Sequence, residues 1–517
     1  MCAVRFLALF VCLAVSACSR VPAAPARSPN QPVTLAIGWP FISGQDSING
    51  IQQATRLLSF EGLVFFGRDG RPQPRLAQSW TESPDGLSWA FQLRPNAFFH
   101  DGSRVDSAAV KASLVRTLAS PARDFSPGLL DIVGLETPKP DQLVIRVKTR
   151  SAFLLDDLIV SIAKPVPGGA AVGTGPYVTS STSPVTSSTS PTEVVMKAFP
   201  SYYRGVPNID RIVWKSYTTA RTAWAAMMRG EIDFLYDVAP DAADFMRDEA
   251  SVEDFSFLRN YVHGVVFNSR RRLFQDSRVK RALNYAVDRS AIIDQVFKGH
   301  GVAAYTPTWP QHWAYDTKLP NYAYDPAKAV ALLDATGLKF SDRVDPQRSP
   351  ARLRFTCILP ANVASLERMA LIVQRNLSQI GVDMQLETVN LDELNRRVLA
   401  GNFDAVLVDL IAGNSAGRPY VLWYSTSKQN SAGYHDAQVD QAFDRLRQAV
   451  DDDATREAFH DLQLQFLNDP PALFLAFGET TRAVSRRFQP VTPAGGDVFR
   501  TIPEWQLADV IKSRNTN

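Results

Sequence analysis

Gly230-Glu231-Ile232-Asp233 joins a helix-forming segment, 220–229, to the strand-forming segment 234–238. Far downstream, Gly401-Asn402-Phe403-Asp404 makes the same join between a helix over 392–400 and a strand over 405–410. Glycine often follows a helix because it tolerates left-handed backbone, so coincidence is one interpretation. The repeated Gly-x-apolar-Asp turn favours the other, in which two lobes share related α/β plans.

Other parts of the chain also alternate between helix and strand. Apolar residues recur at helical spacing over 277–287, and Asp288 is placed to cap a second helix that stops at Gly299. Asp325-Pro326 opens a helix that Gly337 ends, by the usual capping preferences. A helix over 364–380 and an alternating strand from Val382 continue the pattern. The sequence therefore predicts an α/β fold.

Size and composition narrow the class of protein. The chain has 517 residues, 45% of them hydrophobic and 10% aromatic, and a formal net charge of +3. This length calls for two or more lobes around separate cores. A nucleic-acid surface would concentrate far more Lys and Arg, and the basic run 269–272 is short enough to be a solvated loop. We expect no nucleic-acid partner.

The N-terminus has the features of an export signal. Residues 6–15 form an apolar stretch of about ten residues, whereas a bilayer span needs about 20. Val15-Ser16-Ala17-Cys18 follows and resembles the lipobox of bacterial lipoproteins, which makes Cys18 the expected lipidation site. An ordinary signal peptide cut after Ala17 is the alternative. We expect a signal peptide over 1–17 and a lipid-anchored tether over 18–32, with the body in the periplasm or at the cell surface.

The remaining composition signals concern cysteine and one biased segment. With Cys2 and Cys12 in the signal and Cys18 lipidated, only Cys357 stays in the body, so no intramolecular disulfide is possible. No other stretch is long and apolar enough to cross a membrane. Residues 179–192 are rich in Ser, Thr and Pro and predict a surface loop.

A series of motifs, read in chain order, resembles the extracellular solute-binding proteins of family 5, the group of dipeptide, oligopeptide and nickel receptors. The resemblance extends from about Val33 to Asp509. The motifs are Glu61-Gly62-Leu63-Val64, Leu76-Ala77-Gln78-Ser79-Trp80, Asp85-Gly86-Leu87-Ser88-Trp89, Phe99-His100-Asp101-Gly102, Gly173-Thr174-Gly175-Pro176-Tyr177, Tyr202-Tyr203-Arg204-Gly205, Val266-Phe267-Asn268, Arg281-Ala282-Leu283-Asn284-Tyr285-Ala286-Val287-Asp288-Arg289 and Tyr324-Asp325-Pro326.

The resemblance implies a two-lobed periplasmic-binding-protein-like fold of type II, with an extra subdomain in lobe I. Lobe I would comprise 33–265, including the subdomain at about 61–171, and the C-terminal part 478–517. Lobe II would comprise 266–477. The chain would cross between lobes near 266–268 and again near Phe477.

The resemblance also implies a function without catalysis. A small solute, peptide or peptide-like, would be captured between the lobes and delivered to an ABC permease and ATPase complex by a monomeric receptor. Closure on the ligand draws its energy from the ligand's higher affinity for the closed state. No cofactor is expected.

Candidate ligand residues follow from their positions after strands. Trp39 and Phe41 lie at the end of the first strand, where open α/β sheets bind their ligands. After the strand over 405–410 come the other candidates: Asn414, Arg418, Trp423 and Tyr424. Aromatic rings could stack on flat ligand groups, and Arg418 could pair with a carboxylate. Ordinary packing is the alternative for each aromatic residue.

One departure from the family concerns the ligand's amino group. In peptide-binding members, an Asp in the loop after this strand receives the α-amino group, but residues 411–417 contain no acid. Asp409 would have to shift register to replace it. An ammonium ion buried in a closed cleft requires a charged acceptor. Free-amine peptides are therefore in doubt, and modified peptides, other amides, sugars and opine-like solutes stay open.

A secreted serine hydrolase is one alternative function. Gly413-Asn414-Ser415-Ala416-Gly417 matches the G-x-S-x-G nucleophile motif, with Asp440 and His460 available downstream. That motif must turn directly into a helix, and we expect Arg418-Pro419 to prevent this.

A metal-chelate receptor of the nickel type is the other alternative. The six His residues are not spaced i, i+4 or as His-x-His, so a preformed metal site made only of protein ligands is not expected.

Overall fold

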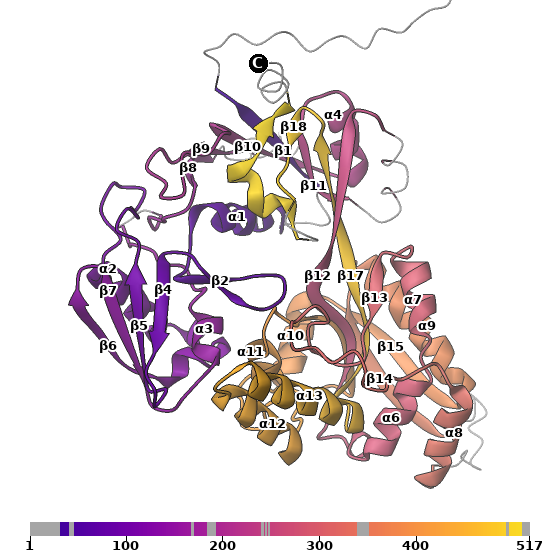
Figure 1. Ribbon diagram of the computed structural model, residues 1–517. Helices are drawn as coiled ribbons and strands as arrows, with labels where there is room; N and C mark the ends of the chain where they lie inside the picture. Colours follow the sequence, from indigo (N-terminus) through magenta and orange to yellow (C-terminus); the bar gives the residue numbers. More distant parts are fainter. Residues whose placement is uncertain are drawn as a thin grey trace, which may run out of the picture.

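The computed structural model describes residues 32–40, 46–166, 170–182, 193–238, 249–338, 351–492 and 496–508, together with Ala242 and Met246. The predicted α/β fold is confirmed. One sheet of eleven strands runs through both lobes in the order β15-β14-β16-β12-β17-β11-β1-β10-β9-β8, with β13 paired to β17 (Figure 1). Its strands are β1 (Thr34–Pro40), β8 (Tyr177–Thr182), β9 (Glu193–Ala198), β10 (Arg211–Tyr217), β11 (Phe234–Val238), β12 (Val252–Phe267), β13 (Gly301–Ala303), β14 (Leu353–Pro360), β15 (Val382–Val389), β16 (Ala405–Ile411) and β17 (Ala472–Ser485).

Strands β12 and β17 are long and antiparallel, and they connect the lobes (Figure 1). Their pairing shifts register between Leu258 and Val262. Val262, Val265 and Val266 are buried in lobe II cores. We therefore propose that the chain enters lobe II within 258–262, a few residues earlier than the sequence led us to expect. For the second crossing we keep the proposed position near Phe477.

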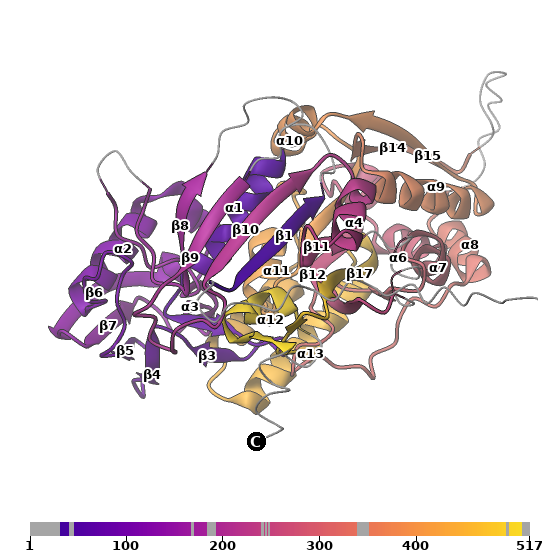
Figure 2. The same cartoon turned by 90° about the horizontal axis from the view of Figure 1, so that it is seen from above.

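Lobe I surrounds one half of the sheet. Helix α1 (Asp46–Ser59) covers one face through Ile51, Ala54 and Leu58, and α4 (Ala220–Met228) covers the other through buried alanines. The C-terminal segment adds η4 (Val498–Glu504) and the small pair β18 (Phe488–Gln489) and β19 (Gln506–Leu507). Figure 2 shows β8, β9, β10 and β1 side by side above α1.

A subdomain with its own core extends from lobe I (Figure 1). It contains a four-stranded sheet in the order β4-β5-β7-β6 and a small β2–β3 hairpin. Its elements are β2 (Val64–Phe66), β3 (Pro72–Pro74), β4 (Ala77–Glu82), β5 (Ser88–Leu93), β6 (Ile132–Lys139), β7 (Gln142–Val147), α2 (Ser107–Ala119), α3 (Phe153–Asp157), η1 (Pro121–Phe125) and η2 (Leu129–Asp131).

Lobe II has a core on each face of its sheet, and the edge strand β15 buries mainly the face of Val382 and Met384. One core lies under α6, α7, α8 and α9, and the other under α10, α12 and α13. The elements are α6 (Ser277–Tyr285), α7 (Arg289–Val296), α8 (Pro326–Ala335), α9 (Ala364–Gln379), α10 (Leu391–Leu399), α11 (Gly417–Trp423), α12 (Ala437–Gln448), α13 (Asp452–Asn468) and η3 (Arg272–Phe274). No helix in the described residues has the length and apolar character needed to cross a bilayer.

The repeated Gly-x-apolar-Asp turn ends a helix and fixes the following strand in the same way in each lobe. Gly230 and Gly401 end their helices with φ of 70° and 66°, values that favour glycine. Asp233 then accepts a hydrogen bond from Ala36 N of β1 (2.9 Å). Asp404 likewise accepts one from Thr356 N of β14 (3.1 Å). Each aspartate thus fixes its strand to the next parallel strand.

Most predicted boundaries agree with the structure to within two residues. Asp288 and Asp325 cap α7 and α8 with their carboxylates, as expected. The Ser/Thr/Pro-rich segment was predicted as a loop over 179–192, but 179–182 belong to β8, so that part of the prediction is wrong. Pairing with β9 overrides the loop-forming composition there. Residues 183–192 lie outside the described residues.

Candidate functional site

The two lobes point the carboxyl ends of their parallel strands at one another. In lobe I, β1 is parallel to β10 and β11, and Val238 at the end of β11 lies opposite Thr481 of β17. In lobe II, β14 is parallel to β15 and β16, and Ile411 at the end of β16 lies opposite Tyr261 of β12. Open α/β sheets bind ligands at the carboxyl ends of their strands. The junction between the lobes is therefore the candidate site.

Trp39 contributes to an aromatic platform on the lobe I side. Its ring stacks on Tyr236 with centroids 4.5 Å apart. The Arg482 guanidinium lies 3.8 Å from the Tyr236 ring and pairs with Asp497 at 2.9 Å. Arg482 is buried, so this pair holds the platform rigidly at the end of β1 and β11. Phe41, the other aromatic candidate in lobe I, lies outside the described residues, as does Cys18.

Asn414 lies in the loop after β16 and contacts two other parts of the molecule. Its Oδ1 accepts a hydrogen bond from Asn260 Nδ2 of β12 (3.1 Å). Its own Nδ2 donates to the carbonyl of Gly67 in the subdomain (3.1 Å). Asn414 is therefore at the junction, where the loop meets the connecting strands.

Arg418 reaches the subdomain instead of the space between the strand ends. Its Nη1 donates to the carbonyl of Phe125 (3.0 Å). The expectation that Arg418-Pro419 prevents a helix is wrong, because α11 begins at Gly417. Pro419 falls in the first turn, where a helix needs no backbone N–H donor.

Trp423 and Tyr424 pack inside lobe II. Trp423 is 2% exposed and meets the rings of Tyr434 and Phe474 edge-on. Tyr424 stacks on Tyr420 at 4.4 Å and donates its hydroxyl hydrogen bond to Asp444. In this structure the two side chains stabilise the helices that follow the loop after β16.

Two charged residues at the junction, Asp237 and Arg259, were not among the sequence candidates, and a third, Asp409, was considered only as a replacement for the missing acid. Arg259 of β12 lowers the pKa of both Asp237, at the end of β11, and Asp409 of β16. Burial still raises the pKa of Asp237 above its ordinary value, despite Arg482 and Arg259. For Asp409 burial also raises the pKa, but the hydrogen bond from His263 and the nearby positive charges outweigh it, and the net shift is downward. The charge of Arg259 thus acts on an acid of each lobe.

A signal for these residues exists in the sequence. Asp237 and Asp409 are each the one charged residue of a strand whose other members are apolar or aromatic, whereas Arg259 is one of three charged residues of β12. A strand rarely carries a charge in such a position unless the charge is paired. What the sequence does not give is the pairing of β11, β12 and β16 in one sheet.

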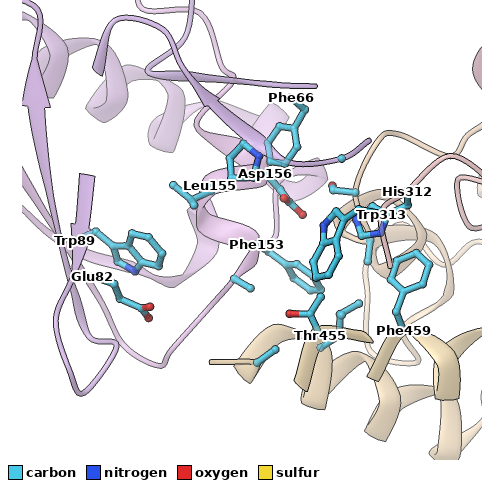
Figure 3. A pocket seen from close by; sticks show the side chains of 17 residues that line it. Phe66, Glu82, Trp89, Phe153, Leu155, Asp156, His312, Trp313, Thr455 and Phe459 are labelled. Atoms are coloured by element: carbon cyan, nitrogen blue, oxygen red, sulfur yellow. The ribbon is translucent and has the colours of Figure 1, made fainter. Parts of the chain in front are cut away.

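A pocket of about 180 Å³ separates the subdomain from lobe II (Figure 3). Its walls come from both sides: Phe66, Trp89, Phe153 and Asp156 from the subdomain, and His312, Trp313, Ser415 and Phe459 from lobe II. Asp156 accepts hydrogen bonds from the Ser415 hydroxyl and Gly417 N. Burial raises the pKa of Asp156 to about 7 and lowers that of His312 to about 4. The pocket exists only while the subdomain and lobe II are in contact.

The residues of the hydrolase alternative each have a different partner. Ser415 binds Asp156, Asp440 accepts from Ser425 N (2.9 Å), and His460 Nδ1 lies 2.7 Å from Asp316. Among the described residues, no three or more His, Cys, Asp or Glu side chains gather in a way that could hold a metal ion.

Comparisons with known proteins agree with this architecture. Residues 71–432 match the family model of bacterial extracellular solute-binding proteins, family 5 Middle. The glutathione-binding protein GsiB of Pectobacterium atrosepticum is 26% identical over 490 residues, which cover 89% of this chain and 90% of that protein.

Two solved structures share the fold at lower identity. NikZ from Campylobacter jejuni, in complex with Ni(L-His), is 21% identical with a TM-score of 0.75, covering 92% of this chain and 99% of that one. The oligopeptide-binding protein AppA from Bacillus subtilis, in complex with a nonapeptide, is 20% identical with a TM-score of 0.73, covering 92% and 100%. With 362 of its 517 residues matching the family model, this chain belongs to the bacterial extracellular solute-binding proteins of family 5.

Proposed function

We propose that this protein is the substrate-binding component of an ABC importer and that it receives a short peptide or peptide-like solute with a free carboxylate. The observation that carries the proposal is that Arg259, on connecting strand β12, favours the charged form of both Asp237 of lobe I and Asp409 of lobe II. A ligand carboxylate would pair with Arg259 when the lobes close, because a charge buried in a closed cleft requires a partner.

The two acids suit the other end of such a ligand. Asp237 is desolvated and only partly compensated by Arg482 and Arg259, as its raised pKa indicates. A ligand ammonium or amide donor beside Asp237 would supply the partner that its carboxylate lacks. This arrangement offers a substitute for the Asp that is missing from the loop 411–417, and it brings free-amine peptides back among the candidates. Relatives named for glutathione and for peptides are consistent with this ligand class.

We further infer a non-catalytic, monomeric receptor held outside the cytoplasm by a lipid on Cys18, with an ABC permease and ATPase complex as its partner. The family relationship and the export signal support this placement. The separate partners of Ser415, Asp440 and His460 favour the receptor over a hydrolase. Ester hydrolysis that Ser415→Ala abolishes would contradict this inference.

A thermal-shift series on the purified protein tests the ligand class. The probes are trialanine with both ends free, its N-acetyl form, its C-terminal amide, and glutathione. Ligand at a hundred times its Kd adds roughly 2.7 kcal/mol to stability, which moves Tm measurably. We expect the shift to require a free carboxylate and to vanish in Arg259→Ala. Arg396→Ala is the control, because the Arg396 side chain is exposed and pairs with Glu393 of its own helix.

The outcomes separate the parts of the proposal. An equal shift with the amide would exclude the role of Arg259 in binding the ligand carboxylate. If only N-acetyl forms bind, the two acids do not receive an ammonium, and the ligand is a blocked peptide. A shift with a nickel–histidine complex alone would replace the peptide class with the metal-chelate alternative.

A further inference from the structure

The tip of the β2–β3 hairpin, residues 67–71, leaves the subdomain and lies against lobe II (Figure 1). Three successive carbonyls of this hairpin tip accept hydrogen bonds from lobe II. Gly67 O accepts from Asn414 Nδ2 (3.1 Å), Arg68 O from Trp309 Nε1 (2.7 Å), and Asp69 O from Trp313 N (2.9 Å). One donor is a backbone N–H and two are side chains, so the three hydrogen bonds form together only when the hairpin tip lies directly against lobe II.

Partly exposed side chains also hold the hairpin tip against lobe II. Both Nη atoms of Arg71 bind the carboxylate of Asp452, at 3.2 and 2.7 Å. The Arg71 guanidinium also lies 3.9 Å from the Trp313 ring centroid. Asp452 is the first residue of α13, where a helix favours negative charge. Arg71 and Asp452 are partly exposed and are not among the residues at the strand ends.

Gly70 shows how closely the surfaces approach. Its φ is 77°, and a Cβ built there would lie 2.2 Å from Asn414 O and 2.3 Å from His312 Cδ2. A side chain at Gly70 would therefore force the hairpin tip away from lobe II, in addition to the strain of its backbone conformation.

Asn414 links this contact to the candidate ligand site. Its amide is held by the hairpin tip on one side and by Asn260 on the other. Asn260 O also accepts hydrogen bonds from Ala412 N (3.0 Å) and Gly413 N (3.3 Å). The loop after β16 is thus attached to the connecting strand at the point where the lobes meet.

We propose that the hairpin tip is a closure latch, which engages Trp309, Trp313 and Asn414 when the lobes close and so positions the loop after β16 for the ligand. Asn414 is the positioning residue that joins the latch to the site. Only the part of this inference that concerns the ligand rests on the proposed function. Because the latch adds contacts to the closed state alone, it raises ligand affinity without touching the ligand.

A charge swap tests the latch at a distance from the site. The variants are Arg71→Asp, Asp452→Arg and the double variant, with and without trialanine. We expect each single variant to raise the trialanine dissociation rate by about threefold to tenfold. Both variants lose the exposed ion pair and gain a pair of like charges, and Arg71→Asp also loses the cation–π contact with Trp313. The double variant should recover part of that loss. Gly70→Ala should act in the same direction as the single variants.

A second measurement needs no ligand. Without ligand the protein exists as open and closed molecules, and the latch should hold part of them closed. Small-angle X-ray scattering of the ligand-free protein should therefore give a larger radius of gyration for Arg71→Asp than for the parent, with partial return in the double variant. The matched control swaps Arg146 and Glu136, an ion pair of similar exposure within the subdomain sheet, and should change neither measurement.

The scattering arm decides the latch even if no probe binds. Single variants that scatter like the parent would overturn the latch. If trialanine fails to bind every variant while scattering changes as expected, the latch stands and the proposed ligand class fails. Bound trialanine with an unchanged dissociation rate in the single variants and in Gly70→Ala would also overturn the latch.

Discussion

Arg75 Nε lies 2.9 Å from Glu61 Oε1, and the Glu61 side chain is only 2% exposed. The same oxygen accepts hydrogen bonds from the hydroxyls of Tyr202 (2.8 Å) and Tyr203 (3.3 Å). Glu61 follows α1 of lobe I, and Arg75 follows β3 of the subdomain. The Glu-Gly-Leu-Val and Tyr-Tyr-Arg-Gly motifs therefore belong to the joint between lobe I and its subdomain.

Replacing Glu61 by Ala would leave the largely buried Arg75 without its counter-ion. Breaking a buried pair by removing one partner typically destabilises by about 3–5 kcal/mol, and we expect a loss of unfolding free energy of at least about 3 kcal/mol. Urea denaturation measures it. Glu136→Ala removes an exposed partner of Arg146 and should change stability by no more than about 1 kcal/mol. Equal losses in the two variants would contradict the role given to Glu61.

Local patterns in the sequence predict most of the elements. The strand expected over 234–238 is β11 with those bounds, and α9 ends one residue before the expected Ile380. The helix α9 carries a periodic apolar face and a glycine stop at Gly381, and β11 follows the Gly-x-apolar-Asp turn directly. The start of α11 was missed because its Pro419 reads as a helix breaker, and only its place in the first turn makes it harmless.

Arg289 explains why the motif around Asn284 and Asp288 ends in an arginine. Its guanidinium is buried and donates to five acceptors: Ala304 O, Phe474 O, Asn284 O, Val287 O and Asn284 Oδ1. Lysine cannot reproduce this planar set of donors. We expect Arg289→Lys to lower the unfolding free energy by at least about 2 kcal/mol, because buried carbonyls lose their donors.

The control for Arg289 is Arg396→Lys on the exposed face of α10, which should stay within about 0.5 kcal/mol of the parent. Urea denaturation compares the two. Should Arg289→Lys prove as mild as the control, the hydrogen bonds from Arg289 would not be what stabilises the start of α7.

The candidate site was only partly predictable. Trp39 and Asn414 could be placed because both follow strands, and strand ends mark the ligand edge of an α/β sheet. Trp423 and Tyr424 follow the same strand, but α11 turns both into the lobe II core. Asp237, Arg259 and Asp409 are far apart in the chain, and only the order β16-β12-β17-β11 brings them to one junction.

The pH dependence of stability should reflect Asp157 of α3. Burial, and then the charge of Asp156, raise the pKa of Asp157 from 3.8 to about 8. Between these values the folded protein holds a proton that the unfolded chain has released, so this carboxyl's contribution to stability falls as pH rises from about 4 to about 8. The slope for one carboxyl is at most about 1.4 kcal/mol per pH unit.

Asp157→Asn keeps the acceptor for Gly128 N, which Asp157 Oδ2 binds at 2.7 Å, but it cannot titrate. We expect a flatter decline of unfolding free energy between pH 5 and 8 in this variant, measured by urea denaturation at three pH values. Asp453→Asn, at a fully solvated position, should keep the parent's slope. A parent and Asp157→Asn with the same slope would show that Asp157 ionises normally in the folded protein.

Trp39 and Trp423 form a matched pair that separates binding from packing. Trp423→Ala empties a core position and should lower the unfolding free energy by about 3–5 kcal/mol, with little effect on the affinity of the molecules that stay folded.

Trp39→Ala removes the half-buried partner of Tyr236 and should destabilise less. Because an aromatic stacking contact is worth about 0.5–1.5 kcal/mol, Trp39→Ala should weaken trialanine binding by roughly twofold to tenfold. Calorimetric titration and urea denaturation of both variants give the two quantities separately. If Trp423→Ala loses affinity and Trp39→Ala does not, the ligand lies on the lobe II helices and not on the platform at the end of β1.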